Sequence, residues 1–360
     1  MTKPGGIYYP EYLQLDKLLN AQQLESDRLG NPAHDELLFI VVHQAYELWF
    51  KLILFELKSV IDMFNDDIVD ERQIGRIVAL LERIHAIQRL MIGKLEVLET
   101  MTPLDFLEFR DLLVPASGFQ SVQFKELEIR LGIKRDQRIP TDREFFYSRL
   151  SDEHREYLYK IEALPSLFEV TQTWLERFPF LNFEGFDFWH EYERSVEQML
   201  ERDRNIIESN STLPPNVLEH QLAELDATRM RFNALFDQSK FDELRAAGEF
   251  RFSHRGMLVA IFINLYRDEP LLQLPFRYLS ALVELDQNLT TWRSRHALMV
   301  HRMLGSKIGT GGSSGHDYLR RTTDQNRAFK DLFNLSTFLI RRSEIPKLPN
   351  HIQNSMGFRF

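Results

Sequence analysis

The stretch that decides the fold is residues 32–64, which read PAHDELLFIVVHQAYELWFKLILFELKSVIDMF. Its apolar residues recur at spacings of three and four, the period of an α-helix that turns one face to a protein core. Asn31 and Pro32 form a helix-start signal, an N-cap followed by a proline that the first helical turn tolerates. We therefore expect one long helix from about Pro32 to Phe64.

The helical period dominates the rest of the chain as well. Thr102-Pro103-Leu104-Asp105 is another cap signal and predicts a short helix that ends near Leu113. No strand pattern and no internal repeat is visible, so we predict an all-α fold, a helical bundle in a single domain spanning 1–360. Further helices are expected at about 71–99, 134–160 (a solvated pair with a loop at 139–141), 216–247, 275–304 and 318–339, with a mobile linker at 209–215 and a glycine-rich loop at 305–315.

Composition narrows the classes of function. The net charge is −9, from 44 Lys+Arg against 53 Asp+Glu, a surface that repels nucleic acid and anionic membranes. No uninterrupted apolar run approaches the roughly 20 residues that span a bilayer, and the first residues lack a signal-peptide pattern. We therefore expect a cytoplasmic protein with no membrane or nucleic-acid partner.

The chain contains no cysteine. This excludes disulfides, thiolate zinc sites, iron–sulfur clusters, thiolate-ligated haem and a cysteine nucleophile. Any metal must be held by histidine, a carboxylate, tyrosine or methionine.

His296 stands out among the histidines. It lies on a predicted helix with Trp292 one turn earlier, so the two rings share a face. An imidazole on a rigid helix beside a flat aromatic ring is a workable axial ligand for haem iron. His301 is the rival, but five residues further on it points about 140° away. An ordinary structural histidine remains the alternative at both positions.

Two pairs at a spacing of four residues are further candidates. Phe39 and His43 lie on an apolar stripe, where the histidine is either a hydrogen-bonded core residue or part of a pocket wall. Phe106 and Arg110 repeat the pattern, and a buried arginine there would need an anionic partner such as a carboxylate. An exposed Arg110 with its stem on apolar surface is equally compatible with the sequence.

The glycine-rich loop, Gly309 to Gly315, superficially resembles a phosphate cradle. It lacks the Gly-Lys-Ser/Thr ending and follows a helix rather than a strand, so both nucleotide-binding fingerprints fail. The hydroxyl of Thr310 could instead close over a small polar ligand, and a plain flexible loop is the alternative.

Several ordered blocks run along nearly the whole chain: Tyr9 to Leu15, His34 to Glu36, Phe39, His43 to Lys51, Leu98 to Phe106, Pro115 to Ser121, Phe252 to Arg255, Trp292 to Gly315 and Asp331 to Phe333. Together these blocks resemble the tryptophan 2,3-dioxygenase family. So many blocks in order are far more specific than any single motif above.

The resemblance implies a helical, homotetrameric haem dioxygenase fold with one haem b per protomer, active in the Fe²⁺ state. It implies His296 as the proximal iron ligand, His43 as the catalytic distal histidine that faces the indole N–H, Arg110 as the partner of the substrate carboxylate and Thr310 as the partner of its ammonium group. Further residues match the family's substrate-binding set: Phe39, Ile40, Val41, Val42 and Phe106 as pocket walls, Ser117 as a distal hydroxyl, and Tyr9, Tyr12 and Leu13 in a segment (1–20) that reaches a neighbouring subunit. One departure is Pro10, where the family usually has glycine.

The implied reaction uses molecular oxygen to cleave the indole C2–C3 bond of L-tryptophan, giving N-formyl-L-kynurenine in the first step of the kynurenine pathway. In this interpretation His43 positions the substrate and is not an obligatory base. Three alternatives remain open at the level of sequence: a haem relative that hydroxylates or oxygenates a modified tryptophan, a non-catalytic haem or tryptophan sensor, and a structural helical scaffold.

Overall fold

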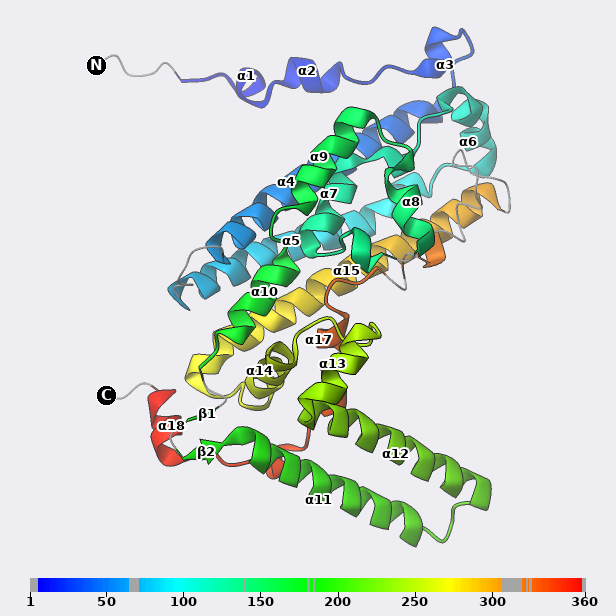
Figure 1. The fold of residues 1–360 in the computed structure, drawn as a ribbon. Coiled ribbons are helices and arrows are strands. Elements are labelled where there is room, and N and C mark those ends of the chain that lie inside the picture. The colour runs from blue at the N-terminus through cyan, green and yellow to red at the C-terminus, as the bar shows by residue number, and fades with distance from the viewer. Residues whose placement is uncertain are drawn as a thin grey trace, which may run out of the picture.

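Three long helices form the spine of the molecule in this computed structural model, which describes residues 6–64, 71–138, 140–179, 182–183, 185–305, 319–321, 323 and 326–357. They are α4 (Asp35–Phe64), α5 (Glu71–Leu98) and α15 (Gln273–Leu304). Helix α5 packs along both α4 and α15, and the three run side by side (Figure 1). The all-α prediction is confirmed.

Shorter helices cover and extend this spine. They are α1 (Tyr9–Leu13), α2 (Leu15–Leu19), α3 (Glu25–Arg28), α6 (Pro103–Arg110), α7 (Val122–Leu131), α8 (Pro140–Ser148), α9 (Asp152–Glu162), α10 (Leu167–Glu176), α11 (Phe188–Ser209), α12 (Pro215–Phe236), α13 (Gln238–Ala246), α14 (His254–Leu265), α17 (Lys330–Asn334) and α18 (Asn350–Ser355). Single 3₁₀ turns lie at Asp111–Leu113, Gly118–Gln120, Arg135–Gln137, Pro270–Leu272, Leu335–Phe338 and Arg342–Glu344.

A small antiparallel hairpin is the one exception to the prediction that the chain has no strands. Strand β1 (Asn182–Phe183) pairs with β2 (Phe186–Asp187), and Gly185 takes a positive φ of 76° in the turn between them. Glycine adopts this conformation without steric cost. Two-residue strands are too short to leave an alternating pattern in the sequence, which is why the prediction missed them.

The start of α4 corrects the predicted boundary, because the helix begins at Asp35 and not at Pro32. The chain before it is held in a turn by side chains. The Ser26 hydroxyl accepts the Ala33 N–H at 3.0 Å, and the Glu36 carboxylate accepts the N–H of Ser26 at 2.9 Å. The backbone N–H of Ala33, which lies in the stretch predicted to be helical, is thus bonded to a side chain outside the helix.

Two other boundaries differ from the predictions. The charged pair of helices exists as α8 and α9, but Pro140 already belongs to α8, and the break follows Ser148. The helix expected at 318–339 is interrupted, because the buried Asp286 carboxylate accepts the N–H groups of Ala328 (3.2 Å) and Phe329 (3.1 Å) and bends the chain there. That carboxylate comes from α15, so no local pattern announces the bend.

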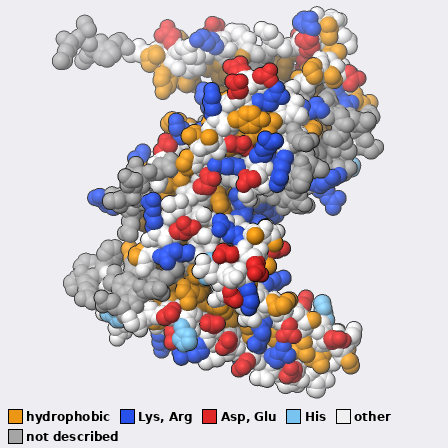
Figure 2. Space-filling view, viewed as in Figure 1, with side chains coloured by type: hydrophobic (Ala, Val, Ile, Leu, Met, Phe, Trp, Pro, Cys, Tyr) orange, Lys and Arg blue, Asp and Glu red, His pale blue; other side chains and the backbone are white. Residues whose placement is uncertain are grey.

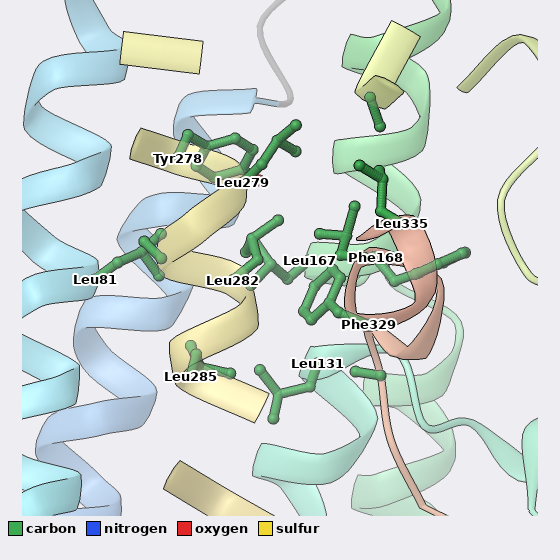
Figure 3. Close-up of a cluster of buried hydrophobic side chains, with 14 of the residues drawn as sticks. Leu81, Leu131, Leu167, Phe168, Tyr278, Leu279, Leu282, Leu285, Phe329 and Leu335 are labelled. Carbon is green, nitrogen blue, oxygen red and sulfur yellow. The ribbon is translucent and has the colours of Figure 1, made fainter. Parts of the chain in front are cut away.

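The core lies where α15, α5, α7 and α10 meet (Figure 3). Leu282 of α15 and Leu81 of α5 are fully buried, and Leu167 of α10 and Leu131 of α7 close the same cluster. Phe329, which lies at the bend held by the Asp286 carboxylate, packs into this cluster from the C-terminal region. The core therefore fixes α15 against segments from both halves of the sequence.

Two parts project from this body (Figure 1). The N-terminal arm, residues 7–19 with α1 and α2, extends from one end, and the α11–α12 hairpin extends from the other. The stretch 209–215, predicted as a mobile linker, is the short turn that joins α11 to α12. It divides no lobes.

Helix α4 is also the one described helix that is long and apolar enough, by length and composition alone, to cross a membrane. The sequence-based expectation concerned an uninterrupted apolar run, and this helix does not contain one, because Glu47, Lys51 and Glu56 interrupt it. One of its faces packs into the core through Ile53, Leu57 and Val60, which are at most 1% exposed. A second face, Leu37, Val41, Leu48 and Phe55, is 46–68% exposed in the isolated chain.

Candidate functional site

A cavity of about 320 Å³ opens between α4, α6, α7 and α15. This lies within the range of roughly 300–1,000 Å³ that is usual for ligand sites. Its lining is mostly apolar, with a few polar and charged side chains. Six of the predicted site residues line it together: Phe39, His43, Phe106, Arg110, Ser117 and His296. Residues far apart in the sequence thus converge on one site.

The imidazole of His296 projects from α15 into this cavity. Its ring lies parallel to that of Trp292, with an interplanar angle of 1° and centroids 5.3 Å apart. Neither ring nitrogen has a hydrogen-bond partner among the described residues. Burial lowers the pKa of His296 to about 4, with a smaller contribution from His43, so the ring is neutral at pH 7. A neutral imidazole with a free ring nitrogen is what an axial metal ligand requires.

The rival ligand, His301, is exposed and does not line the cavity. The angular offset predicted from helix geometry accounts for this, because residues five apart on a helix face different directions. Within the described residues no group of three histidine or acidic side chains is arranged to hold a metal ion. Of the two histidines considered on α15, His296 is therefore the one placed to bind a metal in this cavity.

His43 faces the cavity from α4 with a defined tautomer. Its Nδ1 lies 2.7 Å from the carbonyl oxygen of Phe39, which can only accept, so Nδ1 carries the hydrogen. Burial is the largest effect on the His43 pKa and lowers it, although that hydrogen bond and the Glu47 carboxylate act in the opposite direction. The neutral ring then presents Nε2 as a hydrogen-bond acceptor.

An aromatic wall stands beside His43. The ring of Phe39 is centred 4.0 Å from that of His43. It stacks on the ring of Phe106, with centroids 5.7 Å apart and an interplanar angle of 27°. Phe109 closes the group edge-on, 5.5 Å from Phe106. Such a surface suits a flat aromatic ligand.

Arg110 reaches the cavity from the last turn of α6. The helix is fixed at its start by a complete capping box, in which Thr102 accepts the Asp105 N–H and Asp105 accepts the Thr102 N–H. The side chain of Arg110 is 13% exposed and lies 3.9 Å from the carboxylate of Asp111, which is 85% exposed. An arginine enclosed in this way can bind a carboxylate with both arms of its guanidinium group.

The other predicted site residues fall into three groups. Ser117 lines the cavity and caps the following 3₁₀ turn. Ile40, Val41 and Val42 are not among the residues that line it in the isolated chain: successive helical residues turn by about 100°, so Val41 faces outward and Val42 enters the core. Tyr9, Tyr12 and Leu13 are exposed on the N-terminal arm, and Thr310 lies outside the described residues.

One side of the cavity is lined by buried charged and polar residues that were not predicted from the sequence. Lys125, Glu128, Arg138, Arg293 and Asn326 all line it, and each is at most 6% exposed. The usable signal was the presence of charged residues on the apolar faces of 122–131 and of the helix that carries His296. Sequence alone could not show that these faces meet.

Lys125 is the unusual member of this group. Its ammonium group lies 4.0 Å from the centre of the Phe146 ring, and within the described part of the chain it has no hydrogen bond or ion pair. Burial lowers the pKa of Lys125 to about 8, against a raising effect of Glu128. A buried cation without an anionic partner is costly, so this wall favours a ligand that brings a carboxylate.

A comparison with known protein families matches residues 1–339 to the family described as tryptophan 2,3-dioxygenase. The match covers nearly the whole chain. It includes every candidate site residue discussed above.

Individual proteins named tryptophan 2,3-dioxygenase are similar over almost their full length. The protein of Alteromonas mediterranea is 50% identical over 351 residues, which cover 98% of this chain and 97% of that protein. The protein of Bdellovibrio bacteriovorus is 49% identical over 98% of this chain and 99% of its own length. The Xenopus laevis protein is 47% identical over 96% of this chain and 85% of its own length.

Proposed function

This chain belongs to the tryptophan 2,3-dioxygenase family, a haem-dependent oxidoreductase family, and from that premise we propose how its cavity performs the reaction. The substrates are tryptophan and O₂, and the reaction is the first step of tryptophan catabolism. We propose haem b in the Fe²⁺ state as the active cofactor, His296 as the residue that would hold its iron, and cleavage of the indole C2–C3 bond to N-formyl-L-kynurenine.

The residues present fit haem on two grounds. His296 offers a neutral imidazole with no competing hydrogen bond among the described residues. Lys125 offers a buried cation that lacks a partner there, and haem b carries carboxylate side chains that can compensate it. We therefore propose that His296 holds the iron and that Lys125 pairs with a haem carboxylate.

L-Tryptophan is proposed to bind on the side formed by α4 and α6. Nε2 of His43 accepts the indole N–H, since Nδ1 already donates to Phe39. Phe39 and Phe106 pack against the indole ring, and Arg110 pairs with the substrate carboxylate. Ser117 offers a hydroxyl at the cavity wall, and Thr310 is proposed to meet the ammonium group.

These contacts fix the amino acid at its charged end and at its ring nitrogen, so C2 and C3 of the indole are held in one orientation. The apolar walls exclude water from the reacting bond. When bound, haem supplies the redox-active iron at which dioxygen reacts. His43 keeps the indole N–H in place, and nothing in its environment requires it to remove that proton.

The observation that carries this proposal is the convergence of His43, Arg110 and His296 on a single cavity. The test begins with an anaerobic spectrum of the reduced, haem-loaded protein with and without L-tryptophan. Oxygen is then admitted, and the mass of the product is measured by mass spectrometry. A substrate-dependent spectral change and a gain of two oxygen atoms are expected. One added oxygen would indicate a monooxygenase, absence of turnover a sensor, and absence of Soret absorption a scaffold.

The iron ligand has its own test. His296→Ala should purify without haem or with a grossly altered Soret band, because the other imidazole of the cavity, His43, projects from a different helix, α4, and its Nδ1 is engaged by the carbonyl oxygen of Phe39. His301→Ala is the matched control on the same helix and should retain a normal spectrum. A normal Soret band in His296→Ala would move the ligand elsewhere.

We further propose a cytoplasmic homotetramer without a membrane or nucleic-acid partner. The exposed face of α4 and the apolar side chains of the N-terminal arm, which reach 68% exposure at Tyr8, are surfaces that a second copy would cover. Tyr9, Tyr12 and Leu13 would then approach a neighbouring site. Charges of both signs are interleaved on the face shown in Figure 2, which gives no extended basic area for nucleic acid.

A further inference from the structure

Five buried residues from four separate segments form a closed ring of hydrogen bonds and ion pairs at the border of the cavity. They are Arg293 of α15, Glu128 of α7, Arg138, Asp142 of α8 and Asn326. Each is at most 5% exposed. Asp142 is the one member that does not line the cavity.

The ring can be followed contact by contact. Arg293 donates through Nη1 to the carbonyl oxygen of Asn326 (2.7 Å) and through Nη2 to Glu128. The other oxygen of Glu128 lies 2.9 Å from Nη2 of Arg138, whose Nη1 lies 3.0 Å from Asp142. The Asn326 amide donates to that same Asp142 oxygen at 3.1 Å, which closes the circuit.

The ring is electrically self-sufficient, because two guanidinium groups face two carboxylates. It therefore has no need of a ligand charge, unlike the neighbouring Lys125. A buried ion network of this kind contributes little net stability compared with apolar packing of the same volume. Because the ring lies at the cavity, a role in orienting the side chains around that cavity is favoured over a role in stability.

Arg293 is the member that connects the ring to the proposed iron ligand. It lies three residues before His296 on α15, so both side chains leave the helix within one turn. Its two arms reach in two directions, to α7 and to the segment at Asn326. Rotation of α15 about its axis would break one of these contacts and would also move the imidazole of His296.

We infer that Arg293 is a positioning residue, which holds α15 in the rotation that aims His296 at the centre of the cavity. The inference rests on the proposed function of His296. It assigns no contact between Arg293 and the substrate, and it predicts that the geometry of the axial ligand depends on both arms of this guanidinium group. Lysine keeps the charge but cannot make both contacts in the same way.

The test compares Arg293→Lys with Arg251→Lys. Arg251 is a matched control because it also clamps the C-terminal segment, donating to the carbonyl oxygens of Ala328 and Gly132, but it does not line the cavity. The readouts are the iron–histidine stretching band of the reduced haem protein, the rate of haem transfer to apomyoglobin, and the KM for tryptophan.

In Arg293→Lys we expect a shifted or broadened iron–histidine band and haem loss faster by roughly tenfold, as is typical when the support of a metal ligand is removed. Arg251→Lys should lower the thermal midpoint while its haem-loss rate stays within about twofold of wild type, because a distant site acts independently. A purely structural role for Arg293 would make the two variants behave alike, and that result would overturn the inference.

If Arg293→Lys does not fold, Glu128→Gln keeps the side-chain volume and one acceptor for Arg293, and it is measured in the same way. Failure of both to fold would also overturn the inference, since the ring would then be needed for folding as such. Wild-type protein that binds no haem would instead overturn the proposed function, and this inference with it.

Discussion

At the scale of single residues, the site depends on which atoms of its polar side chains carry a hydrogen. The carbonyl oxygen of Phe39 holds the hydrogen of His43 on Nδ1 and leaves Nε2 as an acceptor. On α15, burial keeps His296 neutral by lowering its pKa. The same low-polarity surroundings strengthen any ion pair that a ligand makes with Arg110.

The carboxylate partner of Arg110 gives the first prediction. Arg110→Ala should weaken tryptophan binding by about 2–5 kcal/mol, the usual cost of removing one partner of a buried charge pair. The measurement is tryptophan affinity from the spectral change of the reduced protein. Arg28→Ala, an exposed arginine on α3 that pairs with Glu25, is the control and should bind normally. Unchanged affinity in Arg110→Ala would contradict the assignment.

At the scale of secondary-structure elements, α6 shows how a local signal supports the site. Its capping box begins at Thr102 and its last residue is Arg110, so the cap stabilises the helix that carries the arginine. A helix of eight residues has little intrinsic stability and relies on such a cap.

Thr102→Ala is therefore expected to destabilise the protein by about 1 kcal/mol and to raise the KM for tryptophan. Ser151→Ala removes the cap of α9, where Ser151 accepts the His154 N–H, and serves as the matched control. It should cost similar stability in urea unfolding but leave KM unchanged. Equal KM values in the two variants would show that the α6 cap has no influence on substrate binding.

The seam between α5 and α15 carries a pH-dependent contact. His85 is 2% exposed, and its Nε2 donates to the Ala281 carbonyl oxygen at 2.9 Å. Burial is the main effect and lowers the His85 pKa, although Glu284, 3.4 Å from Nδ1, acts in the opposite direction and Arg89 adds to the lowering. The unfolded chain therefore takes up a proton at a higher pH than the folded protein does.

It follows that the contribution of His85 is fully present above about pH 6.5 and is lost as the pH falls below that value. In His85→Gln, the urea midpoint should fall less steeply than in wild type between about pH 7.5 and pH 5. His220→Gln on exposed α12 is the control and should follow wild type. A wild-type slope in His85→Gln would remove this histidine from the acid response.

At the scale of the whole molecule, the most distinctive feature is apolar surface that the single chain leaves uncovered. On α4 the exposed positions Leu37, Val41, Leu48 and Phe55 are spaced by four and seven residues, so they form one stripe along the helix. The opposite face of the same helix is fully packed in the core. A helix with two apolar faces is typical of a subunit interface.

Phe55→Glu tests this interface. The side chain is 68% exposed in the isolated chain, so the folding of the protomer should be preserved while the assembly dissociates. The expected result is a lower mass in light scattering without detergent and an unchanged helical circular-dichroism spectrum. Ile206→Glu on α11, also exposed at 55%, should keep the mass of wild type. An unaltered mass in Phe55→Glu would place the interface on another surface.

Much of this protein could be predicted from its sequence, because helix formation and helix capping are local. The apolar spacing of three and four residues predicted the helical spine, and Thr102 and Asp105 predicted α6. The one-turn spacing of Trp292 and His296 predicted that their rings share a face, and the structure shows them stacked. The family resemblance rests on the same one-dimensional information. It was confirmed over 98% of the chain.

What only the tertiary structure decided depends on contacts between distant segments. Asp286 bends the chain at Ala328 from 42 residues away, and Arg293 meets Glu128 across 165 residues of sequence. The outward direction of Val41 and the exclusion of Lys125 and Glu128 from solvent likewise depend on which face of each helix meets its neighbours. Periodicity shows that a helix has a buried face; which other helix covers that face, and which charges meet there, is determined by packing in three dimensions.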